Sequence, residues 1–279
     1  MYDIVGVIGF GRMGSQIVIE LLTLGHDVVL YSTTKRDRKD VEGAVRRSLI
    51  KRHIAESHAE DLLKCLSLDG DGGKSLKDCK LVIESTSEDL ETKKRIIEML
   101  SSVCADDTVI ATNTSSLSIT ALSKLYKRPE RFAGIHFFNP VYNMELVEVI
   151  RSDKTDDMVL KDVLSFVSSM KKTPIVLNDS PGFIVNRLLL WQINEAARLL
   201  DSDVSSVSDI DLAIRKGLNH PMGPFQLADY IGLDICYAIL TQLHESTGKS
   251  EFIPAESISK LVAEGKHGKK TGTGFYEYT

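Results

Sequence analysis

The sequence of 279 residues lacks the features that mark several protein classes. Its four cysteines form no CxxC pair and no Cys/His set with zinc-ligand spacing, so no metal site is expected. No apolar run approaches the length of a membrane span, so no membrane partner is expected either. The formal net charge of −5 argues against nucleic acid as a main partner.

No signal or transit peptide is expected within this numbering, because the apolar residues of a first strand begin at Ile4. Since the cysteines form no disulfide framework, we expect a soluble intracellular protein with reduced thiols, cytoplasmic as numbered. The mitochondrial matrix is the alternative location if a presequence has been removed.

Hydrophobic residues make up 43% of the chain, enough for a sizeable core. They occur in segments that are typical of strands and helices in turn. Short apolar runs predict strands at residues 4–8, 27–31, 66–68, 81–84 and 109–112, with helices such as 90–103 and 118–125 between them. This alternation indicates an α/β fold with a parallel, doubly wound sheet. Asp179-Ser180-Pro181 is expected to open a helix, and helical periodicity dominates from there onward. We therefore predict a Rossmann-type domain over 1–179 and a smaller all-helical domain over 180–279.

A glycine-rich loop follows the first strand directly. Gly9, Gly11 and Gly14 stand in a GxGxxG pattern between a predicted strand and a predicted helix, the context of a dinucleotide-binding loop. The alternative is that these glycines only form a turn. Met13 lies in the same loop and is expected beside the cofactor.

The second predicted strand ends at Ser32, where a dinucleotide-binding fold usually has an acidic residue for the ribose. Thr33, Thr34, Lys35 and Arg36 come next, so hydroxyl groups and cations could hold a plain ribose or a 2′-phosphate. We expect NAD as the cofactor and leave NADP open.

Two polar segments follow later strands of the predicted sheet, at residues 84–88 and 112–116. Ligands of doubly wound sheets bind at the carboxyl ends of strands, so both segments are expected at the site. Capping of the next helix by Ser115 or Ser116 is the alternative for the second segment.

A basic stretch lies within residues 36–63, which we interpret as a helical hairpin. Arg47 and Lys51 share one helix face, as do Ser48 and Arg52. This cluster could bind a polyphosphate, or it could be a solvated face balanced by nearby acidic residues.

A histidine and a glutamate occupy two successive apolar strands. His136 closes the run over 132–135, Asn139-Pro140 turns the chain, and Glu148 lies within the apolar residues 146–150. A buried carboxylate is costly unless it is paired, and His136 is an available partner. Such a pair has a fixed tautomer and can act as a general base, whereas the alternative is a core histidine bonded to a backbone carbonyl.

The helix expected after Pro181 carries Asn186 within an apolar run. Asn186 is either a core amide or a site residue. The helix is apolar around more of its circumference than one small bundle would cover, so we predict a homodimer through the helical domain.

Seven segments together resemble the L-3-hydroxyacyl-CoA dehydrogenases, including the 3-hydroxybutyryl-CoA dehydrogenases, and they span the chain nearly end to end. They are GFGRMG (9–14), TNTSSLSIT (112–120), FAGIHFFNPV (132–141), ELVEVI (145–150), DSPGFIVNRLL (179–189), HPMGPFQLADYIGLD (220–234) and GKKTGTGFYEY (268–278).

The resemblance implies an NAD-dependent oxidoreductase that interconverts (S)-3-hydroxyacyl-CoA and 3-oxoacyl-CoA in fatty-acid β-oxidation or butanoate metabolism. It implies an active site between the two domains, with an acyl-CoA as substrate and a homodimer as the assembly. The residues matched by motif are catalytic His136 with its partner Glu148, substrate-binding Ser115, Asn186 and Ser48, and cofactor-proximal Glu88, Lys93 and Asn113.

The chain departs from the family pattern at Ser32 and in the basic hairpin, which reads His53-Ile54-Ala55-Glu56 where the family is lysine-rich. CoA contacts beyond Ser48 therefore stay open. Two rival functions remain: a gulonate-type sugar-acid dehydrogenase of the same fold, and a non-catalytic, crystallin-like dinucleotide-binding protein. The presence of both His136 and Glu148 speaks against the second.

Overall fold

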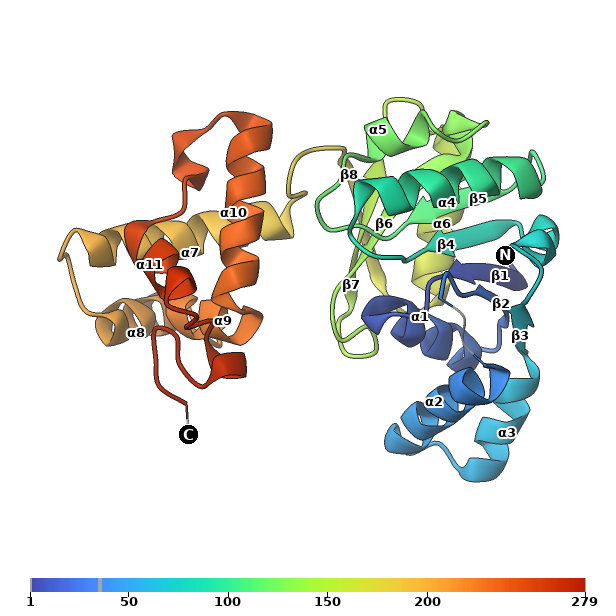
Figure 1. Cartoon of the computed structure of the whole chain (residues 1–279), viewed down its shortest axis with the longest axis horizontal. Helices are drawn as coiled ribbons and strands as arrows, with labels where there is room; N and C mark the ends of the chain where they lie inside the picture. The colour runs from blue at the N-terminus through green and yellow to red at the C-terminus, as the bar shows by residue number, and fades with distance from the viewer. Residues whose placement is uncertain (1, 35–36, 279) are drawn as a thin grey trace. The chain divides into compact units, whose positions relative to one another are not determined.

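The computed structural model describes residues 2–34 and 37–278. The chain divides into two compact units, a sheet unit (Met1–Ser180) and a helical unit (Pro181–Thr279), both drawn in Figure 1. No helix among the described residues is long and apolar enough to cross a membrane.

The sheet unit is built on one eight-stranded sheet with the order β3-β2-β1-β4-β5-β6-β7-β8. The chain runs outward from β1 to β3 and returns to β4 on the other side of β1, which creates a topological switch point between β1 and β4. The strands are β1 (Ile4–Ile8), β2 (Asp27–Tyr31), β3 (Leu66–Asp69), β4 (Leu81–Glu84), β5 (Val109–Thr112), β6 (Phe132–Phe137), β7 (Leu146–Arg151) and β8 (Thr173–Asn178).

Helices cover both faces of this sheet, as a doubly wound fold requires. Apolar side chains of α1 and α6 share one core cluster with inward side chains of the strands, such as Val7 and Val149. Figure 1 shows α4 crossing the sheet on the side facing the viewer. The helices are α1 (Arg12–Thr23), α2 (Arg38–Lys51), α3 (Glu56–Lys64), α4 (Leu90–Val103), α5 (Ile119–Ser123) and α6 (Asp157–Ser169).

The sheet is parallel as predicted except at one pair, because β7 runs antiparallel to β6. Only residues 138–145 join these strands. A parallel crossover needs about a dozen residues, so this loop can make only a reversal. The reversal brings His136 directly opposite Glu148 in the strand register.

The helical unit has its own apolar core, formed by residues such as Leu190, Phe225 and Leu240. Its helices are α7 (Val185–Asp201), α8 (Val207–Gly217), α9 (Pro224–Ile231), α10 (Leu233–Thr247) and α11 (Glu256–Ala263).

The expected helix start at Pro181 is wrong, because α7 begins only at Val185. Gly182 and Phe183 have φ values of 72° and 51°, in the left-handed region that a right-handed helix excludes. Asp179 does not cap α7. Its carboxylate accepts hydrogen bonds from the Ser118 hydroxyl at 2.7 Å and the Thr120 N–H at 2.8 Å, at the start of α5.

Two motifs of the helical unit meet at a buried carboxylate. Asp229 of α9 is fully buried and accepts the backbone N–H groups of Phe275 and Tyr276 at 3.0 and 2.9 Å, and the Tyr278 hydroxyl at 3.0 Å. A Cβ at Gly274 would lie 2.0 Å from Oδ1 of Asp229. The glycine of this C-terminal segment is therefore required by packing.

Candidate active site

The glycine-rich loop packs tightly against the strand ends beside it. Gly9 has a φ of 96°, and a Cβ there would lie 2.4 Å from the carbonyl oxygen of Ser85. A Cβ at Gly14 would lie 2.2 Å from the carbonyl oxygen of Gly9, whereas a Cβ at Gly11 would meet nothing within 4 Å. Gly9 and Gly14 thus permit close packing of the protein backbone. Gly11 leaves space in which the pyrophosphate of a dinucleotide can approach the backbone of the loop.

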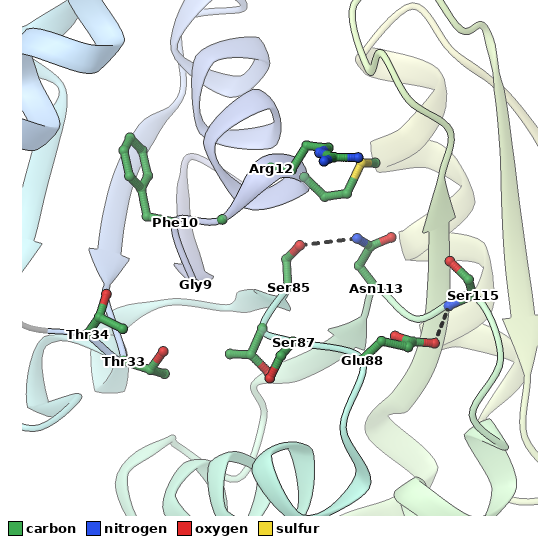
Figure 2. Close-up of a pocket in the computed structure, with 13 residues that line it drawn as sticks. Gly9, Phe10, Arg12, Thr33, Thr34, Ser85, Ser87, Glu88, Asn113 and Ser115 are labelled. Atoms are coloured by element: carbon green, nitrogen blue, oxygen red, sulfur yellow. Dashed lines mark hydrogen bonds between the residues drawn. The ribbon is translucent and has the colours of Figure 1, made fainter. Parts of the chain in front are cut away.

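This space is a pocket of about 470 Å³ at the carboxyl ends of β1, β4 and β5. In Figure 2, Asn113, Glu88 and Ser115 lie at one end of this pocket and Thr33 and Thr34 at the other, with Ser85 between them. The lining residues are Gly9, Phe10, Gly11, Arg12, Met13, Thr33, Thr34, Ser85, Thr86, Ser87, Glu88, Asn113 and Ser115. The sequence did not single out Phe10, Arg12, Ser85, Thr86 or Ser87 as site residues, although all lie in the loops it placed there.

A second hollow of about 570 Å³ shares Thr33 and Thr34 with this pocket and is also lined by Ser32. The Ser32 hydroxyl donates to the carbonyl oxygen of Thr34 at 2.8 Å. Lys35 and Arg36, the cations expected here, lie outside the described residues.

The carboxylates lining this hollow are engaged by the protein itself. Asp37 caps α2 by accepting from the Lys39 N–H at 3.1 Å. Asp69 accepts the backbone N–H groups of Asp71, Gly73 and Ser75 at 2.7–3.1 Å. Partial burial raises the pKa of Asp69, but these hydrogen bonds together lower it below its ordinary value.

Asn113 connects three strand ends at the floor of the pocket. Its Nδ2 donates to the Ser85 hydroxyl at 3.1 Å, a bond drawn in Figure 2, and its Oδ1 accepts the Phe137 N–H at 3.2 Å. The β5 loop is thereby fixed next to the end of β6, where His136 lies.

Glu88 organises the segment that carries Ser115. One carboxylate oxygen accepts the backbone N–H of Ser115 at 2.8 Å, a bond drawn in Figure 2. The same oxygen accepts the Ser116 N–H at 2.9 Å and the Thr114 hydroxyl at 2.6 Å. The capping alternative for Ser115 and Ser116 is wrong, because Ser118 caps α5 through the Ala121 N–H. Ser115 instead lines the pocket.

Lys93 lies behind this pocket and is not among its lining residues. It is completely buried, donates to Glu84 at 2.7 Å and to the carbonyl oxygen of Asn113 at 3.1 Å, and Glu84 is also completely buried. A buried charge pair of this kind holds the ends of β4 and β5 in register beneath the site.

His136 and Glu148 form the pair that the sequence indicated. The Nδ1 atom of His136 lies 2.7 Å from Oε2 of Glu148, and the two side chains are 6% and 0% exposed. The carboxylate accepts a hydrogen bond from Nδ1–H, which assigns the neutral imidazole the tautomer with an unprotonated Nε2. The Phe138 ring packs against the imidazole at a centroid distance of 4.6 Å.

The residues of the basic hairpin divide between a solvated, ion-paired face and the lining of a hollow, the two alternatives expected from the sequence. Arg46 forms ion pairs with Glu60 and Glu56, as on a solvated face. Ser48, Lys51 and Arg52 instead line a hollow of about 500 Å³, together with Gln16, Ile19, His53 and Tyr142. Gln16 and Tyr142 were not identified as site residues from the sequence, because neither belongs to a recognisable motif.

Asn186 belongs to the helical unit, in the first turn of α7, and is half-buried. The fully buried amide of that unit is Asn194, which donates to the carbonyl oxygens of Glu251 and Ile253 at 2.8 Å each. Asn186 is therefore not the main core amide of α7.

A dinucleotide fits the residues present: two glycines pack against neighbouring backbone, Gly11 faces open space, and adjoining hollows continue past the end of β2. Among the described residues, no group of His, Cys, Asp or Glu side chains could hold a metal ion. A dinucleotide pocket beside a carboxylate-bound histidine defines the class of nicotinamide-dependent dehydrogenases.

The comparisons with known proteins agree. The 3-hydroxyacyl-CoA dehydrogenase NAD binding domain matches residues 4–180, and the C-terminal domain of the same family matches residues 182–278. The chain belongs to the 3-hydroxyacyl-CoA dehydrogenase family and is an oxidoreductase, which confirms the predictions of family, fold and enzyme class.

Individual relatives match over nearly their whole length. A 3-hydroxybutyryl-CoA dehydrogenase from Clostridioides difficile is 40% identical, covering 98% of both chains. A mitochondrial hydroxyacyl-coenzyme A dehydrogenase from Sus scrofa is also 40% identical, over 98% of this chain and 90% of that protein. The crystal structure of (S)-3-hydroxybutyryl-CoA dehydrogenase from Ralstonia eutropha has a TM-score of 0.94 at 35% identity, covering 100% of both chains.

Proposed function

We propose that this protein interconverts (S)-3-hydroxyacyl-CoA and 3-oxoacyl-CoA with NAD, with His136 as the acid–base residue. The observation that carries the proposal is the His136–Glu148 pair, with its 2.7 Å bond, on the sheet that also carries the glycine loop. When bound, NAD supplies the hydride acceptor, and the protein supplies position and proton transfer.

In the oxidation direction, Nε2 of His136 takes the proton of the substrate hydroxyl, and it returns the proton during reduction. Glu148 keeps Nδ1 protonated and stabilises the imidazolium that forms. Both groups are almost inaccessible to water, so this charge interaction is weakly screened.

Ser115 is proposed to donate a hydrogen bond to the substrate oxygen, which would fix the reacting carbon near His136. Its support is its place on the pocket wall, held by the bond from its N–H to Glu88. Asn186 is proposed as a second donor, supported by its match to the family motif and by its half-buried position.

The nucleotide of CoA is proposed to occupy the 500 Å³ hollow beside Ser48 and Lys51. Arg52 is held by Glu20 at 2.8 Å and lies over the Tyr142 ring. The exposed Lys51 therefore supplies the charge for a phosphate. Lys51→Ala is expected to raise KM for acetoacetyl-CoA several-fold at unchanged kcat, because it removes binding remote from the chemistry.

The decisive experiment follows NADH consumption with acetoacetyl-CoA. We expect turnover by the wild type and a loss of about 10² or more in kcat for His136→Gln, the usual effect of losing a general base. Near-wild-type turnover by His136→Gln would remove the proposed role. No turnover by the wild type, with activity on a sugar acid or none at all, would favour one of the rival functions.

A parallel measurement with NADPH tests the end of β2. Asp37 and Asp69, the described carboxylates of this hollow, each accept backbone N–H groups of the protein. The ratio of kcat/KM for NADH to that for NADPH reports how strongly the Ser32 site selects NAD.

The homodimer remains a proposal. Its support is the face of α7, where Leu188 and Trp191 are 63% and 46% exposed and Leu199 is also exposed. A monomeric mass in light scattering at micromolar concentration would refute it. The four free thiols support an intracellular location, which we likewise propose.

A further inference from the structure

The loop that joins β6 to β7, residues 138–145, is held by side chains from distant parts of the sheet unit. It leaves β6 just after His136 and enters β7 just before Glu148. Its position therefore bears on both members of the proposed acid–base pair.

Gln16 on α1 binds this loop with both ends of its amide. Nε2 donates to Oδ1 of Asn139 at 2.9 Å, and Oε1 accepts the Val141 N–H at 2.8 Å. The same Nε2 also donates to the carbonyl oxygen of Arg12 at 3.1 Å, in the first turn of the helix that follows the glycine loop. One side chain thus links the cofactor-binding helix to the loop after His136.

Lys172 binds the same loop through the loop's backbone carbonyl groups. Its side chain is 5% exposed, and Nζ donates to the carbonyl oxygens of Val141 and Met144 at 2.6 and 3.0 Å. Glu20 of α1 lies 3.8 Å away and supplies the nearest carboxylate. Burying an ammonium group is costly, so its placement under a surface loop points to a role in holding that loop.

We propose that Gln16 and Lys172 are positioning residues for the dehydrogenase reaction. They fix the loop 138–145 to α1 and thereby set the distance between the cofactor-binding loop and the imidazole of His136. The ring of Phe138, which packs on the imidazole at 4.6 Å, is the part of the loop that transmits this constraint. The inference rests on the proposed function, because it assigns His136 the proton transfer.

The test compares Gln16→Leu and Lys172→Met with the wild type in acetoacetyl-CoA reduction. A misplacement of about 1 Å can cost about 10²-fold, and each variant leaves the other positioning residue in place, so we expect each to lower kcat by about tenfold. KM for NADH should stay unchanged, because neither side chain lines the cofactor pocket. Lys172→Arg keeps a cationic donor and should retain more of kcat than Lys172→Met.

The isotope effect separates positioning from loss of folded protein. With NADH deuterated at the transferred position, a misplaced imidazole makes the chemical step slower and raises the isotope effect on kcat. Val163→Ala serves as the matched control, because Val163 is a fully buried residue of α6 in the core. It should lower the unfolding midpoint and leave the isotope effect unchanged.

Wild-type kcat in both Gln16→Leu and Lys172→Met would overturn the proposal. So would a loss of kcat that follows the folded fraction with no change in the isotope effect. If Lys172→Met does not fold, Gln16→Leu decides alone, since Gln16 is only half-buried. His136→Gln in the same assay distinguishes the two failures. An active His136→Gln refutes the proposed function, whereas an inactive His136→Gln beside unaffected Gln16→Leu and Lys172→Met refutes only the positioning role.

Discussion

Replacing Glu148 by glutamine isolates the contribution of its charge. Glutamine keeps the size of the side chain and one hydrogen bond to Nδ1 of His136, but it removes the charge that lies 2.7 Å from that nitrogen. The imidazole gains its proton during the reaction in a site that is 6% exposed at His136. The substitution therefore acts mainly on the transition state, where the positive charge develops.

The magnitude follows from Coulomb's law. For charges about 4 Å apart at an effective dielectric constant of about 20, the interaction is about 4 kcal/mol. The retained hydrogen bond offsets part of this, so we expect a loss of about 2 to 3 kcal/mol, equivalent to roughly 30- to 160-fold in kcat. The glutamine amide can also present its N–H to Nδ1, which would place the imidazole proton on Nε2 and block the base.

The assay is oxidation of (S)-3-hydroxybutyryl-CoA with NAD. The double variant with His136→Gln should be no slower than His136→Gln alone, because Glu148 acts through the imidazole. Turnover of Glu148→Gln within twofold of wild type would refute the reasoning.

Three further outcomes are expected. Burial raises the pKa values of three of the four thiols to about 11 or 12, so Ellman's reagent should titrate only the half-exposed Cys65 in the native protein and all four thiols in denaturant. Burial also raises the pKa of Asp229, so its contribution to stability is largest below its ordinary pKa and declines as the pH rises through the raised one. Asp229→Asn should accordingly lower the midpoint temperature of unfolding more at about pH 4 than at about pH 7. Gly14→Ala should destabilise the protein, because its Cβ would lie 2.2 Å from the carbonyl oxygen of Gly9. Gly11→Ala should keep the midpoint temperature of unfolding, because its Cβ meets no atom within 4 Å, and should raise KM for NADH. Melting curves and steady-state kinetics measure the two effects.

Several elements could be predicted because their signals are local. The strand-turn-helix context of Gly9, Gly11 and Gly14 depends on neighbouring residues only, and α4 matches the predicted range 90–103. The start of α7 could not be predicted in this way. Asp179 and Pro181 read as a cap and a first helical residue, but the carboxylate binds the start of α5, which lies about sixty residues earlier in the chain.

The sequence by itself determined the alternation of strands and helices, the glycine loop and the presence of a buried histidine and carboxylate, because periodicity and burial cost are properties of short segments. Only the tertiary structure decided the antiparallel register of β6 and β7, in which His136 lies directly opposite Glu148. It also decided that the buried Lys93 binds Glu84 next to the site, and that Gln16 and Lys172 bind one loop. Such contacts join residues far apart in the chain, and they form only when the whole sheet has assembled.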